Sequence, residues 1–106
     1  MRGTTVLTVD AYLLNGHVPS SNVGRIVDMY LATCPGVVLR KITINSRSDM
    51  MSVYKKDGIK NLPTVDVPGE IVQRRRKRIL LTDPEEIEKW CKETVRQIDS
   101  ANRRRR

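Results

Sequence analysis

Residues 54–67 read Tyr-Lys-Lys-Asp-Gly-Ile-Lys-Asn-Leu-Pro-Thr-Val-Asp-Val, and this stretch decides the fold. Gly58 can adopt the positive φ that closes a helix, so we expect a helix to end there. Pro63 lacks an N–H group, which suits the first residue of a strand or a bulged edge. The stretch therefore predicts a helix end, a short connector and a strand that begins at Pro63.

The residues before this stretch predict a strand, a helix and a second strand. Residues 4–14 and 37–44 are rich in apolar and β-branched side chains and are expected to form strands. Ser20 or Ser21 is expected to cap the helix between them. A connection of this length favours a right-handed crossover and two parallel strands. The helix carries one apolar stripe, whose last member we expect to point into the core: Val23, Ile26, Val27, Tyr30, Leu31 and Cys34.

A short helix and a hairpin are expected around the deciding stretch. Ser48 or Asp49 can cap the short helix that Gly58 ends. The third strand is predicted over residues 63–67, with a turn at Pro68-Gly69 and a fourth strand over residues 70–81.

The last helix has the clearest start signal in the chain. Asp83 is a suitable N-cap and Pro84 suits the first helical position, while the helical pattern ends near Ala101. The predicted order is thus β-α-β-α-β-β-α, an α/β fold with a four-stranded mixed sheet and helices on both faces. We expect one domain over residues 1–101 and a basic tail over residues 102–106.

The segment Leu62-Pro63-Thr64, preceded by Gly58-Ile59, resembles the cis-proline loop of the thioredoxin and glutaredoxin superfamily. In an ungapped comparison from the first strand onward, the family's Cys-Gly-Pro-Cys motif falls on His17-Val18-Pro19-Ser20. The proline is matched and both cysteines are replaced. The resemblance implies a thioredoxin-like fold that lacks the redox motif, with a cis-proline facing the altered motif.

The replaced motif argues against dithiol chemistry. Ser20 cannot form a disulfide, and His17 cannot replace the attacking thiolate. Cys34 and Cys91 form no C-x-x-C pair and are expected to be buried small hydrophobic residues. We therefore expect no thiol-disulfide activity, no metal and no cofactor. One alternative stays open, because thioredoxin-like transferases use this region for glutathione: an enzyme acting at His17, Ser20 and Pro63.

The basic residues are concentrated in two runs. The formal net charge is +8, and removing the nine charges of the two runs leaves −1 for the rest of the chain. Five adjacent cations exceed what the protection of a sheet edge against aggregation requires. The first run is therefore expected to be an electropositive face for phosphate or carboxylate groups, or a nuclear-import signal. We predict that both runs bind a partner: Arg74, Arg75, Arg76, Lys77, Arg78, Arg103, Arg104, Arg105 and Arg106.

The leading interpretation is a redox-inactive binding or structural protein that docks on a polyanion or an acidic protein surface. Its small size and basic tail would suit a component of a large assembly such as a viral particle. The alternative in the same class is a nucleic-acid-binding protein that contacts phosphates without sequence preference, because no aromatic residues interrupt the arginines. The sequence shows neither a membrane span nor a signal peptide, so we expect an intracellular reducing compartment, the cytoplasm or nucleus, and no membrane partner.

Overall fold

The computed structural model describes the backbone of residues 7–72 and 75–104, and the side chains of residues 7–69 and 78–100. Its elements follow the predicted order β-α-β-α-β-β-α. They are β1 (Leu7–Leu14), α1 (Val18–Leu31), β2 (Val37–Ile44), α2 (Arg47–Asp57), β3 (Thr64–Val72), β4 (Arg75–Leu81) and α3 (Pro84–Arg104). The part of the first predicted strand before Leu7 lies outside the described residues.

The four strands form one mixed sheet with the order β2-β1-β3-β4. β1 pairs in parallel with β2 along its whole length, from Leu7↔Val37 to Leu14↔Ile44. β3 runs antiparallel to β1, and β4 runs antiparallel to β3. The predicted parallel pair and the predicted hairpin are therefore confirmed.

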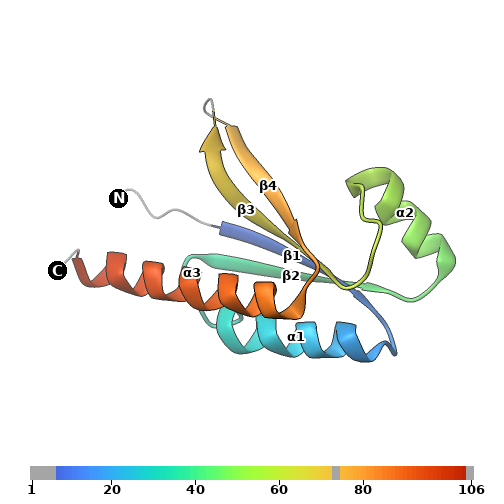
Figure 1. Ribbon diagram of the computed structural model, residues 1–106, viewed down its shortest axis with the longest axis horizontal. Coiled ribbons are helices and arrows are strands. Elements are labelled where there is room, and N and C mark those ends of the chain that lie inside the picture. Colours follow the sequence, from blue (N-terminus) through green and yellow to red (C-terminus); the bar gives the residue numbers. More distant parts are fainter. Residues whose placement is uncertain (1–6, 73–74, 105–106) are drawn as a thin grey trace.

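The core lies on one face of the sheet, between the strands and the helices α1 and α3. These two helices lie side by side below the sheet in Figure 1, while α2 stands apart at its right-hand end. Because neighbouring strand residues point to opposite faces, alternate residues of β1 and β3 face the two helices. The core residues are Val9, Ala11, Val23, Val27, Leu31, Val65, Val67, Ile87 and Cys91.

The helix α2 is held differently from α1 and α3, because none of its residues is buried. The Ser46 hydroxyl caps it by accepting the Asp49 N–H at 3.1 Å, so Ser48 and Asp49 are not the caps we predicted. Gly58 ends the helix with a φ of 71°, which confirms its predicted role. None of the helices in the described part of the chain is both long enough and apolar enough to cross a membrane.

The start of α1 differs from our prediction. His17 is the N-cap residue, so the helix begins before both Ser20 and Ser21, with Pro19 in its first turn. Proline suits this turn because the first helical N–H groups have no acceptor within the helix.

The turn predicted at Pro68 and Gly69 is wrong, because β3 continues through both residues. The register between β3 and β4 shifts between Pro68 and Ile71, which is the kind of irregularity that admits a proline into a strand. Within the described residues, β3 pairs with β1 over residues 64–66, so Pro68 lies beyond this pairing.

The prediction that Cys34 points into the core is also wrong. The helix α1 ends at Leu31, three residues before Cys34, so the apolar stripe does not extend that far. Cys34 is half-buried, and its thiol lies 3.8 Å from the carbonyl oxygen of Pro35. It lines a hollow of about 600 Å³ between the last turns of α1 and the second half of α3.

Candidate functional site at the start of α1

The altered motif and the proline loop meet at one end of the sheet. Residues 17–20 begin α1, directly after β1. Tyr12 of β1 pairs with Thr64, the first residue of β3, and the peptide bond between Leu62 and Pro63 is cis. The loop before β3 therefore lies beside the carboxyl end of β1, where α1 starts.

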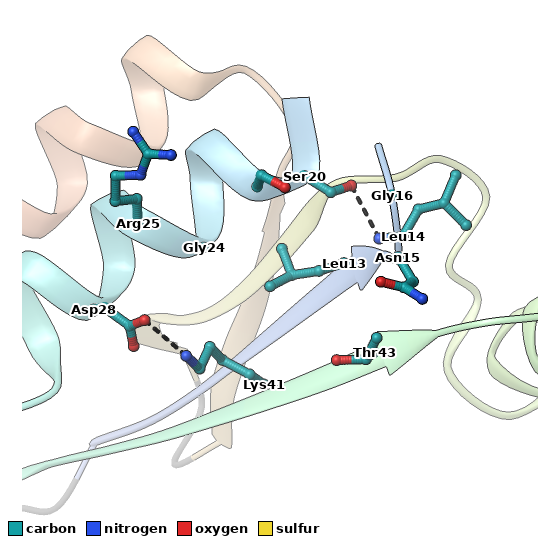
Figure 2. Close-up of a pocket in the computed structure, with 11 residues that line it drawn as sticks. Leu13, Leu14, Asn15, Gly16, Ser20, Gly24, Arg25, Asp28, Lys41 and Thr43 are labelled. Carbon is teal, nitrogen blue, oxygen red and sulfur yellow. Dashed lines mark hydrogen bonds and ion pairs between the residues drawn. The ribbon is translucent and has the colours of Figure 1, made fainter. Parts of the chain in front are cut away.

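Ser20, on which the second cysteine of the family motif falls in the ungapped comparison, is 1% exposed. Its hydroxyl accepts the N–H of Leu14 at 2.9 Å and lies 3.0 Å from Nδ1 of His17. Figure 2 shows the first of these bonds, which ties the first turn of α1 to the end of β1. The hydroxyl is thus buried and engaged on two sides, an arrangement that ties the start of α1 to the end of β1.

Neither cysteine lies at the start of α1. Cys91 is fully buried as predicted, and burial raises the pKa of its thiol to about 12. Burial also raises the pKa of Cys34. A high thiol pKa disfavours the thiolate that thiol exchange requires. Cys34 also lies beyond the far end of α1, roughly 20 Å from its start for a helix of this length.

A polar groove of about 350 Å³ extends from this position between α1 and β2. Ser21, Gly24 and Arg25 of α1 line one side, and Lys41 and Thr43 of β2 line the other. Figure 2 shows the Lys41 ammonium group reaching Asp28 of α1, and the two are 2.7 Å apart.

Gly24 has a local packing reason to be glycine. A Cβ atom there would lie 3.1 Å from Cδ1 of Leu13, which is closer than most side chains tolerate. The glycine therefore allows α1 to lie close to β1 beside the groove. Among the described residues, no group of three or more histidine, cysteine, aspartate or glutamate side chains could hold a metal.

The opposite sheet face carries an ion network that the sequence did not indicate to us. Asp10 is 7% exposed and accepts two hydrogen bonds from Arg40, at 2.6 and 2.9 Å. Arg78 donates to Asp66 Oδ1 at 2.8 Å, and to the carbonyl oxygens of Asp66 and Thr8 at 3.0 Å. The signal available in the sequence was an aspartate inside an apolar central strand, because a buried carboxylate requires partners.

Arg78, which we predicted to bind a partner, takes part in this network. Its guanidinium group joins β4 to both β3 and β1, so it is engaged within the protein. A cleft of about 400 Å³ lies next to the network, between this face and α2. In that cleft, burial and the nearby Asp57 carboxylate raise the pKa of Tyr12 to about 12.

The two basic runs occupy an outer strand and a helix end. Arg75 to Arg78 belong to β4, the last strand of the sheet, and Arg103 and Arg104 are the last residues of α3. In Figure 1, β4 starts at the top of the view and α3 ends at the left, while α2 lies at the right. Arg74, Arg105 and Arg106 lie outside the described residues, as do the side chains of residues 75–77, 103 and 104.

Comparisons with known proteins identify the fold. No model of a protein family matches the sequence, and no curated protein matches it either. The structure is similar to oxidised mitochondrial thioredoxin 3 from Saccharomyces cerevisiae, with a TM-score of 0.58, 14% identity and coverage of 84% of this chain and 79% of that one. It is equally similar to oxidised thioredoxin from Plasmodium falciparum, with a TM-score of 0.58, 13% identity and coverage of 86% and 83%.

The chain therefore has a thioredoxin-like fold, as the resemblance implied. Its sequence has no pair of cysteines in a C-x-x-C arrangement, and both of its cysteines are free.

Proposed function

We propose that this protein is a redox-inactive thioredoxin-fold binding protein that docks on an anionic surface through the basic edge of its sheet and the second basic run, residues 103–106. We define the basic edge as residues 74–77, the part of the first basic run that precedes Arg78. The observation that carries the proposal is the buried Ser20 hydroxyl at the redox position, hydrogen bonded to Leu14 and beside His17. The Ser20 side chain stabilises the start of α1, so we place the function on another part of the fold.

The placement of the first basic run supports the basic edge as the docking surface. β4 is an outer strand, and Arg78 anchors it through contacts with β1 and β3. The backbone of Arg75 and Arg76 is paired with β3, and a backbone ordered in this way reduces the entropy lost on binding. Because the rest of the chain outside the two runs has a formal charge of −1, the attraction for anions is concentrated in the runs.

The partner is recognised by its anionic oxygen atoms, either phosphates or carboxylates. Arginine forms paired hydrogen bonds with both groups. Base stacking has little support, because Tyr12 is 4% exposed and Trp90 and Tyr30 are partly buried against the core. Tyr54 is 52% exposed, but it lies on α2, away from the start of β4. Contact through charge is therefore the mode that the described side chains favour.

The experiment compares two charge-reversed variants of equal net charge. Arg75→Glu with Lys77→Glu alters the basic edge, and Lys55→Glu with Lys60→Glu is the matched control near α2. Fluorescence anisotropy measures the affinity of each for a labelled single strand, a duplex and polyglutamate. We expect the first variant to lose at least about tenfold in affinity and the control to lose about threefold or less.

The three probes also distinguish the sources of the anionic group. Tighter binding of the oligonucleotides identifies phosphates, and tighter binding of polyglutamate identifies carboxylates. Equal losses in the two variants would show that only net charge matters and would overturn the basic edge. Turnover in an insulin-reduction or glutathione-adduct assay that Ser20→Ala abolishes would overturn the redox-inactive assignment.

A further inference from the structure

The outer strand β2, at the opposite edge of the sheet, has backbone groups available for pairing. It is eight residues long and pairs with β1 without a register shift. On its other side, no strand pairs with it within the described residues. A long, regular edge strand is a template for the addition of another strand.

The hydrogen bonds at the two ends of the β1–β2 ladder define which backbone groups point outward. The N–H of Leu7 donates to the carbonyl of Gly36 at 2.8 Å, and the N–H of Asn15 donates to the carbonyl of Ile44 at 2.9 Å. Since the register between them is unbroken, the even-numbered residues of β2 bond to β1. The N–H and C=O groups of the odd-numbered residues 39, 41 and 43 therefore point away from the sheet.

Two adjacent cations lie at the middle of this edge, and each is held over a different face. Arg40 bonds to Asp10 on the open face, and Lys41 bonds to Asp28 on the side of α1. These ion pairs draw both side chains over the faces of the sheet and leave the outward backbone groups between them. The side chains of Arg40 and Lys41 remain 62% and 43% exposed, so they still act on a strand placed alongside.

The charges select the kind of strand that can pair. In a two-fold antiparallel pairing of two copies about the middle of β2, residues directly opposite each other share a sheet face, so the central pair is Arg40 with Arg40 or Lys41 with Lys41. Like charges directly opposite each other are destabilising. A second copy is therefore disfavoured, whereas a strand with two central acidic residues would be stabilised.

The side chains on either side of Arg40 and Lys41 further restrict which strand can pair with β2. Val38 is 46% exposed on the open face, and Ile42 is half-buried on the same face. On the other face, the groove beside Lys41 and Thr43 has two cations, Lys41 and Arg25, and one acid, Asp28, among its lining residues. An added strand would therefore need apolar side chains toward Val38 and Ile42 and acidic ones at its centre.

We infer that the β2 edge binds an extended acidic segment of a partner protein by antiparallel strand addition. The backbone groups of Leu39, Lys41 and Thr43 supply the hydrogen bonds, and Arg40 and Lys41 select acidic side chains. This mode of recognition obtains affinity from the main chain and specificity from alternate side chains. It uses the opposite sheet edge from the proposed basic edge and does not depend on that proposal.

The test uses the full chain and a capped peptide, Thr-Thr-Val-Glu-Glu-Val-Val-Thr, whose two glutamates fall opposite Lys41 and Arg40. The matched control peptide has two lysines in place of the glutamates. Amide signals of the isotope-labelled protein are followed by NMR during titration. We expect saturable shifts and slowed hydrogen exchange at residues 39, 41 and 43, with at least about tenfold weaker binding of the lysine peptide.

Two variants of the protein test whether the peptide binds at the β2 edge. Thr43→Pro removes an outward N–H without removing a bond to β1, so it should weaken binding about tenfold while the protein stays folded. Lys41→Glu should abolish the preference between the two peptides, because each peptide then faces one opposite and one like charge, and it serves as the second variant if the proline unfolds the chain. No saturable shift at millimolar peptide would overturn the inference. Shifts confined to β4, a β2-mediated dimer, or protection of these three amides in the free protein would also overturn it.

Discussion

The substitution Ser20→Ala tests whether the buried Ser20 hydroxyl is structural. It removes the acceptor of the Leu14 N–H and the contact with His17 Nδ1, at a site that is 1% exposed. Each net hydrogen bond contributes about 0.5 to 1.5 kcal/mol, and a donor left without a partner adds to the cost. We therefore expect the free energy of unfolding to fall by about 2 kcal/mol.

Urea denaturation, followed by the fluorescence of Trp90, measures this loss. Trp90 lies on α3 and packs against the core, so its emission reports the loss of packing between the helices and the sheet. Ser21→Ala is the matched control, because Ser21 is the exposed neighbour in the same helical turn. We expect the control to change stability by less than about 0.5 kcal/mol. Equal stability of the two variants would show that the Ser20 hydroxyl is not structural and would refute the reasoning.

Three further substitutions test other parts of the structure. The pKa of Tyr12 is raised to about 12, so the folded state retains this proton while the unfolded chain loses it above about pH 10. Stability should therefore fall between these values, by at most about 1.4 kcal/mol per pH unit, and Tyr12→Phe should flatten that fall in urea titrations. Asp10→Asn should lower the free energy of unfolding by about 1 to 2 kcal/mol, because it removes the charge that two arginines share. The control Asp28→Asn, in an exposed pair, should lower it by under about 1 kcal/mol. Equal losses of stability would argue against the network. Gly24→Val should lower the melting temperature, because its side chain would press on Leu13, and an unchanged value would show that the helix can move away.

The order of helices and strands could be predicted because the residues at their ends form strong local patterns. Gly58 takes the left-handed conformation that the pattern required. The Asp83 carboxylate accepts the N–H of Glu85 at 3.4 Å, and α3 begins at Pro84 as expected. Each of these signals acts within a few residues, so it can be interpreted without tertiary information.

Two of the failed predictions have a different cause, which is competition from distant parts of the chain. Ser20 was a plausible cap, but its hydroxyl is used by Leu14 of the neighbouring strand. Pro68 and Gly69 looked like a turn, but pairing with β4 keeps them in a strand. No local pattern reports such contacts.

The site was only partly predictable for the same reason. The family resemblance located residues 17–20 and the proline loop, which the fold brings to one end of the sheet. It did not reveal that Arg78 is engaged by Asp66 and by the carbonyl of Thr8, because these contacts join residues that are far apart in the sequence. The first basic run therefore has at least one member with a structural role.

The most direct test of the central claim is the affinity of the full chain for a single-stranded oligonucleotide and for polyglutamate, measured across a series of salt concentrations. The same series is repeated with a chain that ends at Asn102. The account predicts binding at physiological salt with a steep dependence on salt concentration. For the oligonucleotide, loss of the last four arginines should reduce the log-log slope by up to about 3, because each phosphate contact on a single strand contributes roughly 0.7. Negligible binding of both probes near physiological salt would contradict the account.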